Sequence, residues 1–254
     1  MSKAEILYED RDILVIYKPS GLATQTAKAG QQDVVSELKN HLRQQEKLSG
    51  APYGRSAPYL GVIHRLDQPV EGLLVFAKNR KAAASLTGQL QKQGDGEMLC
   101  KRYYAVVCGR PGETEGELVD YIYKDSENRA VIVEQPTDRP AQLSGRAEHP
   151  RARRAVLQYH ILQTDDVRGI ALAEIHILTG RFHQIRAQMA HAGMPLLADR
   201  KYGDEEAAHT AQALGIQNVA LCACHLEFVH PASKEKMNFQ IKPKGRAFSF
   251  FSQL

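Results

Sequence analysis

Three polar clusters in this 254-residue chain contain side chains that could do chemistry, and each lies beside an apolar run or a helical pattern. The first is residues 64–72, with the sequence HRLDQPVEG. The second is residues 101–106, KRYYAV, and the third is residues 180–186, GRFHQIR. Together they offer a carboxylate, phenol hydroxyls, imidazoles and guanidinium groups, which are suited to nucleophilic, acid–base and anion-binding chemistry.

Each of these side chains also has a purely structural interpretation. An aspartate two residues before a proline, such as Asp67, is usually a turn former. Tyr103 at the start of a strand would ordinarily be a half-buried aromatic, and Arg186 could extend from its helix to solvent. His64 and His183 are more often hydrogen-bonded structural histidines than bases. Residue types alone therefore do not separate a site from a structural role.

The elements that must position these clusters are short strands and helices in mixed order. Strands are expected at residues 5–8, 13–17, 72–78, 102–108, 117–123, 130–134, 155–163, 170–178, 219–229 and 237–241. Helices are expected after Asp33 and at residues 80–93, 182–192 and 205–214. Strands in runs with helices between them predict an α+β fold with a mixed, largely antiparallel central sheet and flanking helices. The nearest thing to a boundary, residues 110–117, is only a polar turn, so we expect a single domain over residues 1–254.

Composition describes an ordinary globular chain, with 43% hydrophobic and 24% charged residues. No apolar run could cross a bilayer, and residues 1–10 lack the apolar segment of a signal peptide, so we expect a soluble, cytoplasmic protein. The net charge of +4 is concentrated in residues 139–201, where ten Lys or Arg face five Asp or Glu. The densest part contains Arg146, Arg151, Arg153 and Arg154. This patch suits a phosphate backbone, although a solvated basic loop explains the charge equally well.

The four cysteines are few for this length, and their spacing matches no paired zinc motif. Cys222-Ala223-Cys224-His225 could bind a metal in principle. However, two thiols one residue apart, without a second pair, are a weak pattern for a zinc site. We therefore expect reduced structural thiols, as in a cytoplasmic protein, and no metal.

Taken together, the three clusters resemble the RluA-like family of RNA pseudouridine synthases. His64-Arg65-Leu66-Asp67 and residues 72–78 (GLLVFAK) are similar to that family's H-R-L-D-x-x-T-S-G-L-L-hydrophobic-x-A-K. Residues 101–109 resemble K-x-Y-x-A-x-V-x-G, and residues 180–186 resemble G-R-x-H-Q-I-R. Further matches are residues 18–21 to K-P-x-G, residues 191–199 to H-x-x-x-P-I-x-G-D, residues 202–203 to Y-G, and residues 221–231 to L-H-A-x-x-L-x-F-x-H-P. They occur in the family's order and span residues 6–241.

The chain departs from the family pattern at three positions. Val70-Glu71 replace the usual Thr-Ser, and Cys222 stands where a His is common. Glu71 could alter the hydrogen bonds of the loop or place a negative charge near RNA, which would affect the substrate rather than the reaction class. Because the match begins near residue 6, we also expect no S4-type RNA-binding domain.

The resemblance implies an enzyme that isomerises uridine to pseudouridine in tRNA or rRNA, with no cofactor because no redox step or electron sink is needed. It assigns Asp67 as the essential carboxylate, acting either as a nucleophile at C1′ or as a base on a sugar proton. Arg186 would hold Asp67 in its charged form through a bidentate pair, and Tyr103 would stack on the flipped base and could relay the C5 proton. Further RNA contacts are expected from Arg65, Arg181, His183, Gln184, Arg146, Arg151, Arg153 and Arg154.

Two other functions compete for the same residues. A glycosidase or nucleosidase typically needs two carboxylates flanking the bond, and Glu71 is the only other carboxylate in the Asp67 motif. A non-catalytic RNA-binding protein on the same scaffold would be favoured by loss of Asp67, which is present. We expect a monomer that binds RNA, with no membrane association and no obligate protein partner. The sequence leaves open which RNA and which uridine it modifies.

Overall fold

The computed structural model describes residues 3–26, 30–48, 57–91, 99–109, 111–133, 152–252 and 254. The chain forms two compact units. The first comprises Met1–Arg102 and Cys222–Gly245, and the second comprises Tyr103–Leu221 and Arg246–Leu254. Neither unit is contiguous in sequence, since the chain changes unit within strands β5 (Cys100–Cys108) and β10 (Leu221–Val229) and again after Gly245. The single domain expected from the sequence stays a prediction.

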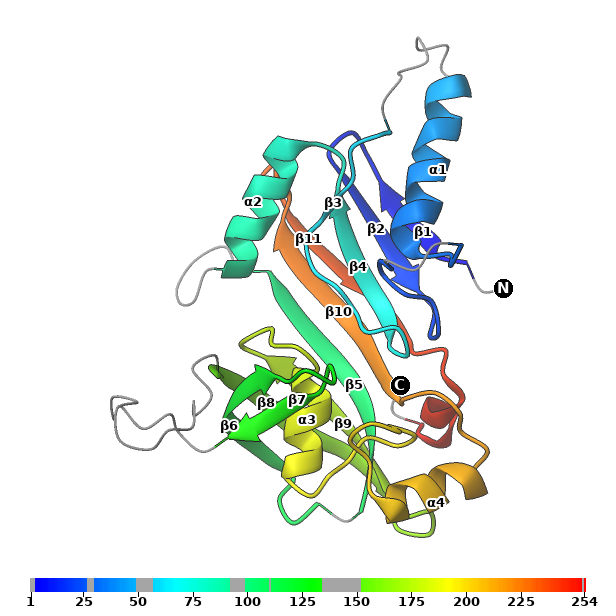
Figure 1. Cartoon of the computed structure of the whole chain (residues 1–254), viewed down its shortest axis with the longest axis vertical. Helices are drawn as coiled ribbons and strands as arrows, with labels where there is room; N and C mark the ends of the chain where they lie inside the picture. The colour runs from blue at the N-terminus through cyan, green and yellow to red at the C-terminus, as the bar shows by residue number, and fades with distance from the viewer. Residues whose placement is uncertain are drawn as a thin grey trace. The chain divides into compact units, whose positions relative to one another are not determined.

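The first unit is built on strands in the order β1-β2-β4-β10, with β3 beside β4 and β11 beside β10. Their bounds are β1 Glu5–Glu9, β2 Ile13–Lys18, β3 Gly61–Val62, β4 Glu71–Ala77 and β11 Lys236–Gln240. All of these pairings are antiparallel except that of β4 with β10, which is parallel. Helices α1 (Val34–Leu48) and α2 (Arg80–Gln91) belong to the same unit (Figure 1). Every residue of β2 and β4 is buried, which explains the continuous apolar runs at residues 13–17 and 72–77.

The second unit continues from β5 through strands in the order β9-β8-β6-β7. Their bounds are β6 Glu115–Lys124, β7 Ala130–Val133, β8 Arg153–Asp165 and β9 Ile170–Ile177. β8 pairs with both β6 and β9, and β6 pairs with β7, all antiparallel. Helices α3 (Gln184–His191) and α4 (Glu205–Ala213) and a 3₁₀ helix at Arg246–Phe250 complete the unit. Ala187 of α3 packs with Ile122, Ala130 and Ala155 in a small apolar core.

The α+β class and its largely antiparallel mixed sheet are confirmed, and most predicted elements are found within two residues of their expected ends. Asp33 caps α1 as predicted, because its Oδ1 accepts the amide N–H of Ser36 at 2.7 Å. The helix expected from residue 182 begins instead at Gln184, because His183 adopts a left-handed conformation with φ 50°. The short strand β3 and the 3₁₀ helix were not predicted. Among the described residues, no helix is long and apolar enough to cross a membrane.

Gly72 is required where β4 meets β10. It has φ 129°, and its Cα is paired with that of Ala223 across the parallel ladder. A Cβ added at Gly72 would lie 2.5 Å from both the N and the O of Ala223. Since both obstacles are backbone atoms, neither can move aside without distorting β10.

We therefore expect Gly72→Ala to lower the free energy of unfolding by roughly 2–5 kcal/mol, combining overpacking with backbone strain. Gly88→Ala is the matched control, because nothing lies within 4 Å of its added Cβ in α2. There the gain in helix propensity should stabilise the protein by about 0.5–1 kcal/mol. Urea denaturation of both variants checks this pair, and equal stability of the two would contradict the steric account.

Candidate functional site

Asp67 lies in the loop that connects β3 to β4. The amide N–H of Val70 donates to the carbonyl oxygen of Asp67 at 3.1 Å, which closes a turn over Gln68 and Pro69. Asp67 therefore begins a turn, as an aspartate two residues before a proline commonly does. Asp67 is half-buried rather than fully exposed.

The backbone on both sides of Asp67 is held by residues 18–24, which we call the cradle segment. It binds the loop by hydrogen bonds to the carbonyl oxygens of three residues, one before Asp67 and two after it. These bonds run from Thr24 Oγ1 to Leu66 O (2.8 Å), from Gly21 N to Gln68 O (2.8 Å) and from Ser20 Oγ to Pro69 O (2.6 Å). Thr24 Oγ1 also accepts the amide N–H of Leu66 at 3.2 Å. These hydrogen bonds hold the backbone of residues 66, 68 and 69 in place, and they thereby restrict the backbone of Asp67 between them.

Lys18 provides the positive charge of the cradle segment. Its side chain is fully buried, and Nζ donates to the carbonyl oxygens of Pro19 (3.0 Å), Leu22 (2.7 Å) and Gln68 (3.2 Å). Burial lowers the pKa of Lys18 to about 7, against the opposing effect of the Asp67 and Glu71 charges, which raise it. An ammonium group therefore lies within electrostatic range of the candidate catalytic carboxylate.

His64 has a structural role, because its ring binds the backbone of β4. Its Nε2 accepts the amide N–H of Val75 at 3.4 Å, so the ring proton is on Nδ1, which is buried and has no hydrogen-bond partner among the described residues. Burial and then the charge of Lys101 hold the pKa of His64 well below its usual value. Its imidazole is therefore neutral at physiological pH. Arg65, in contrast, is exposed, as an RNA contact requires.

Arg186 is oriented by an acidic partner within the second unit. It is 6% exposed, and its Nε and Nη2 donate to the two carboxylate oxygens of Asp199 at 2.7 and 2.8 Å. The ring of Tyr202 lies 5.1 Å from the guanidinium carbon. The interpretation that Arg186 extends to solvent is therefore wrong. Asp199 was not singled out as a site residue, although it ends one of the matched motifs.

The neighbouring motif residues have different environments. His183 Nδ1 lies 2.8 Å from the hydroxyl of Tyr202, which itself accepts the amide N–H of Ala130 at 2.7 Å. The Tyr202 hydroxyl therefore connects the His183 ring to the backbone of β7. Gln184 is buried, and its carboxamide binds Thr179 Oγ1 (2.8 Å), Arg181 N (2.9 Å) and Val156 O (3.0 Å). The RNA contact expected from Gln184 stays a prediction.

Three arginines of the predicted basic patch gather at the start of β8. Arg153 and Arg154 are exposed, and Arg181 Nε donates to the carbonyl oxygen of Arg154 at 2.9 Å. Burial and then the charge of Arg153 lower the pKa of Arg181, as expected of guanidinium groups that share a site. Arg146 and Arg151 lie outside the described residues. Tyr103, assigned to base stacking, is buried in β5 at 5% exposure.

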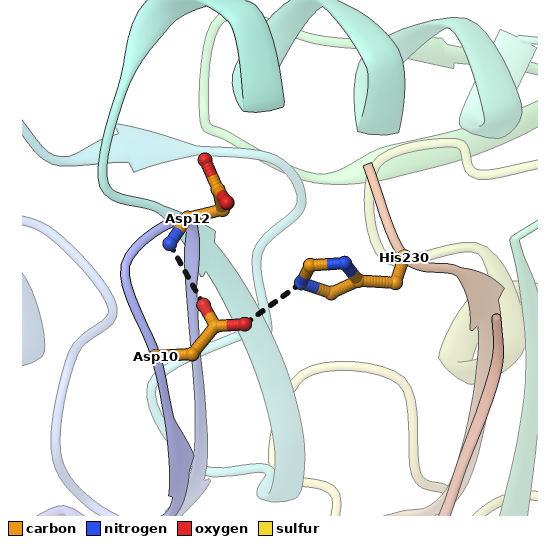
Figure 2. A group of neighbouring side chains, drawn as sticks. All are labelled: Asp10, Asp12 and His230. Atoms are coloured by element: carbon orange, nitrogen blue, oxygen red, sulfur yellow. Dashed lines mark hydrogen bonds and ion pairs between the residues drawn. The ribbon is translucent and has the colours of Figure 1, made fainter. Parts of the chain in front are cut away.

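A group of possible metal ligands lies in the first unit, formed by Asp10, Asp12 and His230, whose ligand atoms are all within 4.8 Å of one another (Figure 2). His230 Nδ1 accepts the amide N–H of Ser233 at 3.0 Å, so the proton of the neutral ring is on Nε2. Nε2 faces Asp10 Oδ2 at 2.8 Å, as an electrostatic contact without hydrogen-bond geometry. A metal on Nε2 would require the proton on Nδ1, where the Ser233 N–H already points. These donors therefore fit a structural pair rather than a metal centre.

The cysteines that could have formed another metal site are structural in their surroundings. None of the four, all of which lie in described residues, forms a disulfide. Cys222 and Cys224 lie on β10, and the Cys224 thiol donates to the carbonyl oxygen of Arg102 at 3.5 Å. Cys222 is fully buried beside Glu71. The reduced structural thiols expected from the sequence are consistent with these positions.

Known proteins of similar sequence agree with the motifs. The sequence pattern of a family described as RNA pseudouridylate synthase matches residues 12–191. The chain is 35% identical over 239 residues to ribosomal large subunit pseudouridine synthase D of Zymomonas mobilis, which covers 92% of this chain and 68% of that protein. It is 30% identical over 233 residues to ribosomal large subunit pseudouridine synthase C of Vibrio cholerae, covering 91% and 63% respectively.

Solved structures support the fold. The human protein named RNA pseudouridylate synthase domain containing 4 superposes with a TM-score of 0.67 over 94% of this chain and 89% of that chain, at 23% identity. A second human protein, RNA pseudouridylate synthase domain containing 1, gives a TM-score of 0.64 over 95% and 84%, at 20% identity. At these identities the likeness concerns the fold alone. The matched family pattern covers most of the chain, so the protein belongs to the RluA-like family of RNA pseudouridine synthases.

Proposed function

We propose that Asp67 is the catalytic carboxylate of this RNA pseudouridine synthase. The observation that carries the proposal is the cradle segment, which binds backbone carbonyls on both sides of a single half-buried aspartate. Pseudouridine formation breaks the N1–C1′ bond of uridine, joins C5 to the same sugar carbon and releases the C5 proton. Whether the carboxylate attacks C1′ or removes a sugar proton, it must be ionised, and its position relative to the target atom must be held to within about 1 Å.

The cradle segment meets both requirements with groups that the first unit already contains. Hydrogen bonds to the flanking carbonyls restrict the loop, and the Lys18 ammonium supplies an opposite charge within the same unit. Glu71, the other carboxylate of the motif, is 4% exposed and engaged in its own hydrogen bonds. It is therefore not available as the second reacting carboxylate that a glycosidase would use.

We further propose that Arg186 and Tyr103 act with Asp67, as the resemblance to the family implies. Both residues belong to the second unit, whereas Asp67 belongs to the first. Asp199 fixes the plane of the Arg186 guanidinium through two charge-assisted hydrogen bonds. A guanidinium that is already oriented loses less conformational entropy when it binds an anionic group, which suits a catalytic role.

The substrate we propose to test first is large-subunit rRNA, because the relatives from Zymomonas mobilis and Vibrio cholerae are named for that RNA. Arg153, Arg154 and Arg181 would bind its phosphates, since clustered guanidinium groups bind such anions with strong salt dependence. Transfer RNA remains the second substrate to examine. In either RNA the target uridine must leave its stack to reach the carboxylate.

Replacing Asp67 by Asn removes the charge but preserves the size of the side chain. We expect wild-type protein to produce carbodiimide-dependent reverse-transcription stops in transcribed large-subunit rRNA or tRNA, and Asp67→Asn to reduce them to background while RNA binding persists. Asp165→Asn is the control, because this carboxylate pairs with Arg168 at the surface of the second unit. Stops that persist in Asp67→Asn would contradict the assignment. Salt-sensitive binding without stops from wild-type protein on either RNA would instead support a non-catalytic RNA-binding protein.

Lys18 should give the stability of the protein a specific pH dependence. Its folded pKa is about 7 against an ordinary value of 10.5, so between these values the unfolded chain binds more protons than the folded one. Unfolding free energy should therefore rise with pH in this window, by up to about 1.4 kcal/mol per pH unit. Urea denaturation of wild type and Lys18→Met between about pH 7 and about pH 9 isolates this contribution. If the difference in unfolding free energy between wild type and Lys18→Met did not change with pH, the lowered pKa of Lys18 would be contradicted.

A further inference from the structure

Two of the positions at which the chain departs from its family pattern are neighbours in space. Glu71 opens β4, and its Cα is paired with that of Cys222 across the parallel β4–β10 ladder. Both side chains are buried, at 4% and 0% exposure. The two departures therefore lie side by side: Glu71, where serine is usual, and Cys222, where histidine is common. Glu71 is four residues after Asp67 in the sequence.

The Glu71 carboxylate is surrounded by donors from two distant segments. The hydroxyl of Tyr17 donates to Oε2, which also accepts the amide N–H of Lys244 at 3.2 Å, and Oε1 accepts the amide N–H of Gly245 at 2.8 Å. Burial and then the Glu71 hydrogen bond raise the pKa of Tyr17, so its hydroxyl remains a donor at physiological pH. A serine side chain is too short to bind the same three donors from this strand position.

These contacts connect Glu71 to the loop that carries Asp67. Tyr17 directly precedes Lys18, whose Nζ donates to the carbonyl oxygen of Gln68. The charges of Asp67 and Glu71 both act on the Lys18 ammonium. Glu71 thus fixes the point where the loop enters β4, and its negative charge helps to balance the buried Lys18 cation that binds the loop.

Cys222 complements this arrangement because its side chain is small and neutral. Burial and then the charge of Glu71 raise the pKa of its thiol well above the usual value, so the thiol remains protonated. The neutral thiol therefore does not compete with the Tyr17 hydroxyl and the two backbone amides that bind the Glu71 carboxylate. A histidine at position 222 would add a ring N–H donor. A serine at position 71, which is smaller than glutamate, would leave room for that ring.

We propose that Glu71 is a positioning residue for Asp67, and that Glu71 with Cys222 replaces the serine and histidine of the family pattern as the support of the catalytic loop. This inference rests on the proposed role of Asp67. It concerns the rate of the chemical step rather than RNA affinity, because Glu71 is buried and bonded within the first unit.

The test compares single-turnover rate, RNA dissociation constant and melting temperature for Glu71→Ser, the double variant Glu71→Ser/Cys222→His and a control. We expect Glu71→Ser to slow pseudouridine formation by roughly 10- to 100-fold with unchanged RNA affinity, since small displacements of a reacting group cost this much. The double variant should recover most of the loss. Glu5→Gln is the control, because Glu5 bonds the side chain of the same Lys244 at 2.7 Å but is more than half exposed. It should behave as wild type.

Wild-type rates in Glu71→Ser, or a loss confined to RNA affinity, would overturn the inference, and failure of the double variant to recover would overturn the pairing with Cys222. If Glu71→Ser does not fold, Tyr17→Phe removes one donor and keeps the ring, with Tyr8→Phe as its control. Tyr17→Phe should slow the reaction several-fold, and equal rates in the two would overturn the inference. Asp67→Asn is assayed alongside. If it remains active, the proposed function fails, whereas an inactive Asp67→Asn with a fully active Glu71→Ser refutes only the role of Glu71.

Discussion

The hydrogen bonds between the cradle segment and the carbonyl oxygens around Asp67 are the interaction on which the candidate site depends. A loop can be partly buried only if its backbone polar groups find partners, because an unpaired buried carbonyl costs as much as a lost hydrogen bond. Here the partners come from two hydroxyls, an amide and the Lys18 ammonium, all within residues 18–24. The same bonds that make burial affordable also restrict where the Asp67 carboxylate can lie. Antiparallel pairing of β2 with β4, which sets Lys18 opposite Gly72, then fixes the cradle segment relative to the loop.

The second unit also contains a buried polar group that needs a partner, and here the partner is an opposite charge. Arg186 is buried, and a buried guanidinium is costly unless it is paired and hydrogen-bonded. Asp199 provides both through its two oxygens, and the same carboxylate accepts the amide N–H of Lys201 at 3.0 Å. The turn at residues 199–202 therefore holds both the arginine partner and Tyr202, which orients His183. Within each unit, contacts among that unit's own residues thus hold the candidate site residue: hydrogen bonds to the loop backbone for Asp67 and an ion pair with Asp199 for Arg186.

Much of the fold could be predicted because its signals are local. The apolar runs of β2 and β4, the Asp33 cap and the glycine and proline residues that end α3 act through neighbours in sequence. Other features depend on distant segments. The left-handed conformation of His183 shortens α3 by two residues, and it is accompanied by a contact with Tyr202, nineteen positions later. The pairing of Glu71 with Cys222 depends on the register of β4 against β10, which periodicity does not reveal. The motifs therefore identified the candidate site residues and contained some of the groups that hold them, such as Lys18 and Asp199, but did not show which group binds which residue.

The most direct test of a positioned carboxylate is to move it without removing it. Asp67→Glu keeps the charge and lengthens the side chain by one methylene, while the cradle segment still fixes the backbone. The measurement is single-turnover release of tritium from RNA labelled at C5 of uridine, which reports the exchange of the C5 proton for the new glycosidic bond. We expect Asp67→Glu to release tritium at least roughly 100-fold more slowly than wild type, since the backbone cannot retreat to restore the geometry. Tritium release at the wild-type rate would contradict the claim that catalysis depends on the precise position of the Asp67 carboxylate.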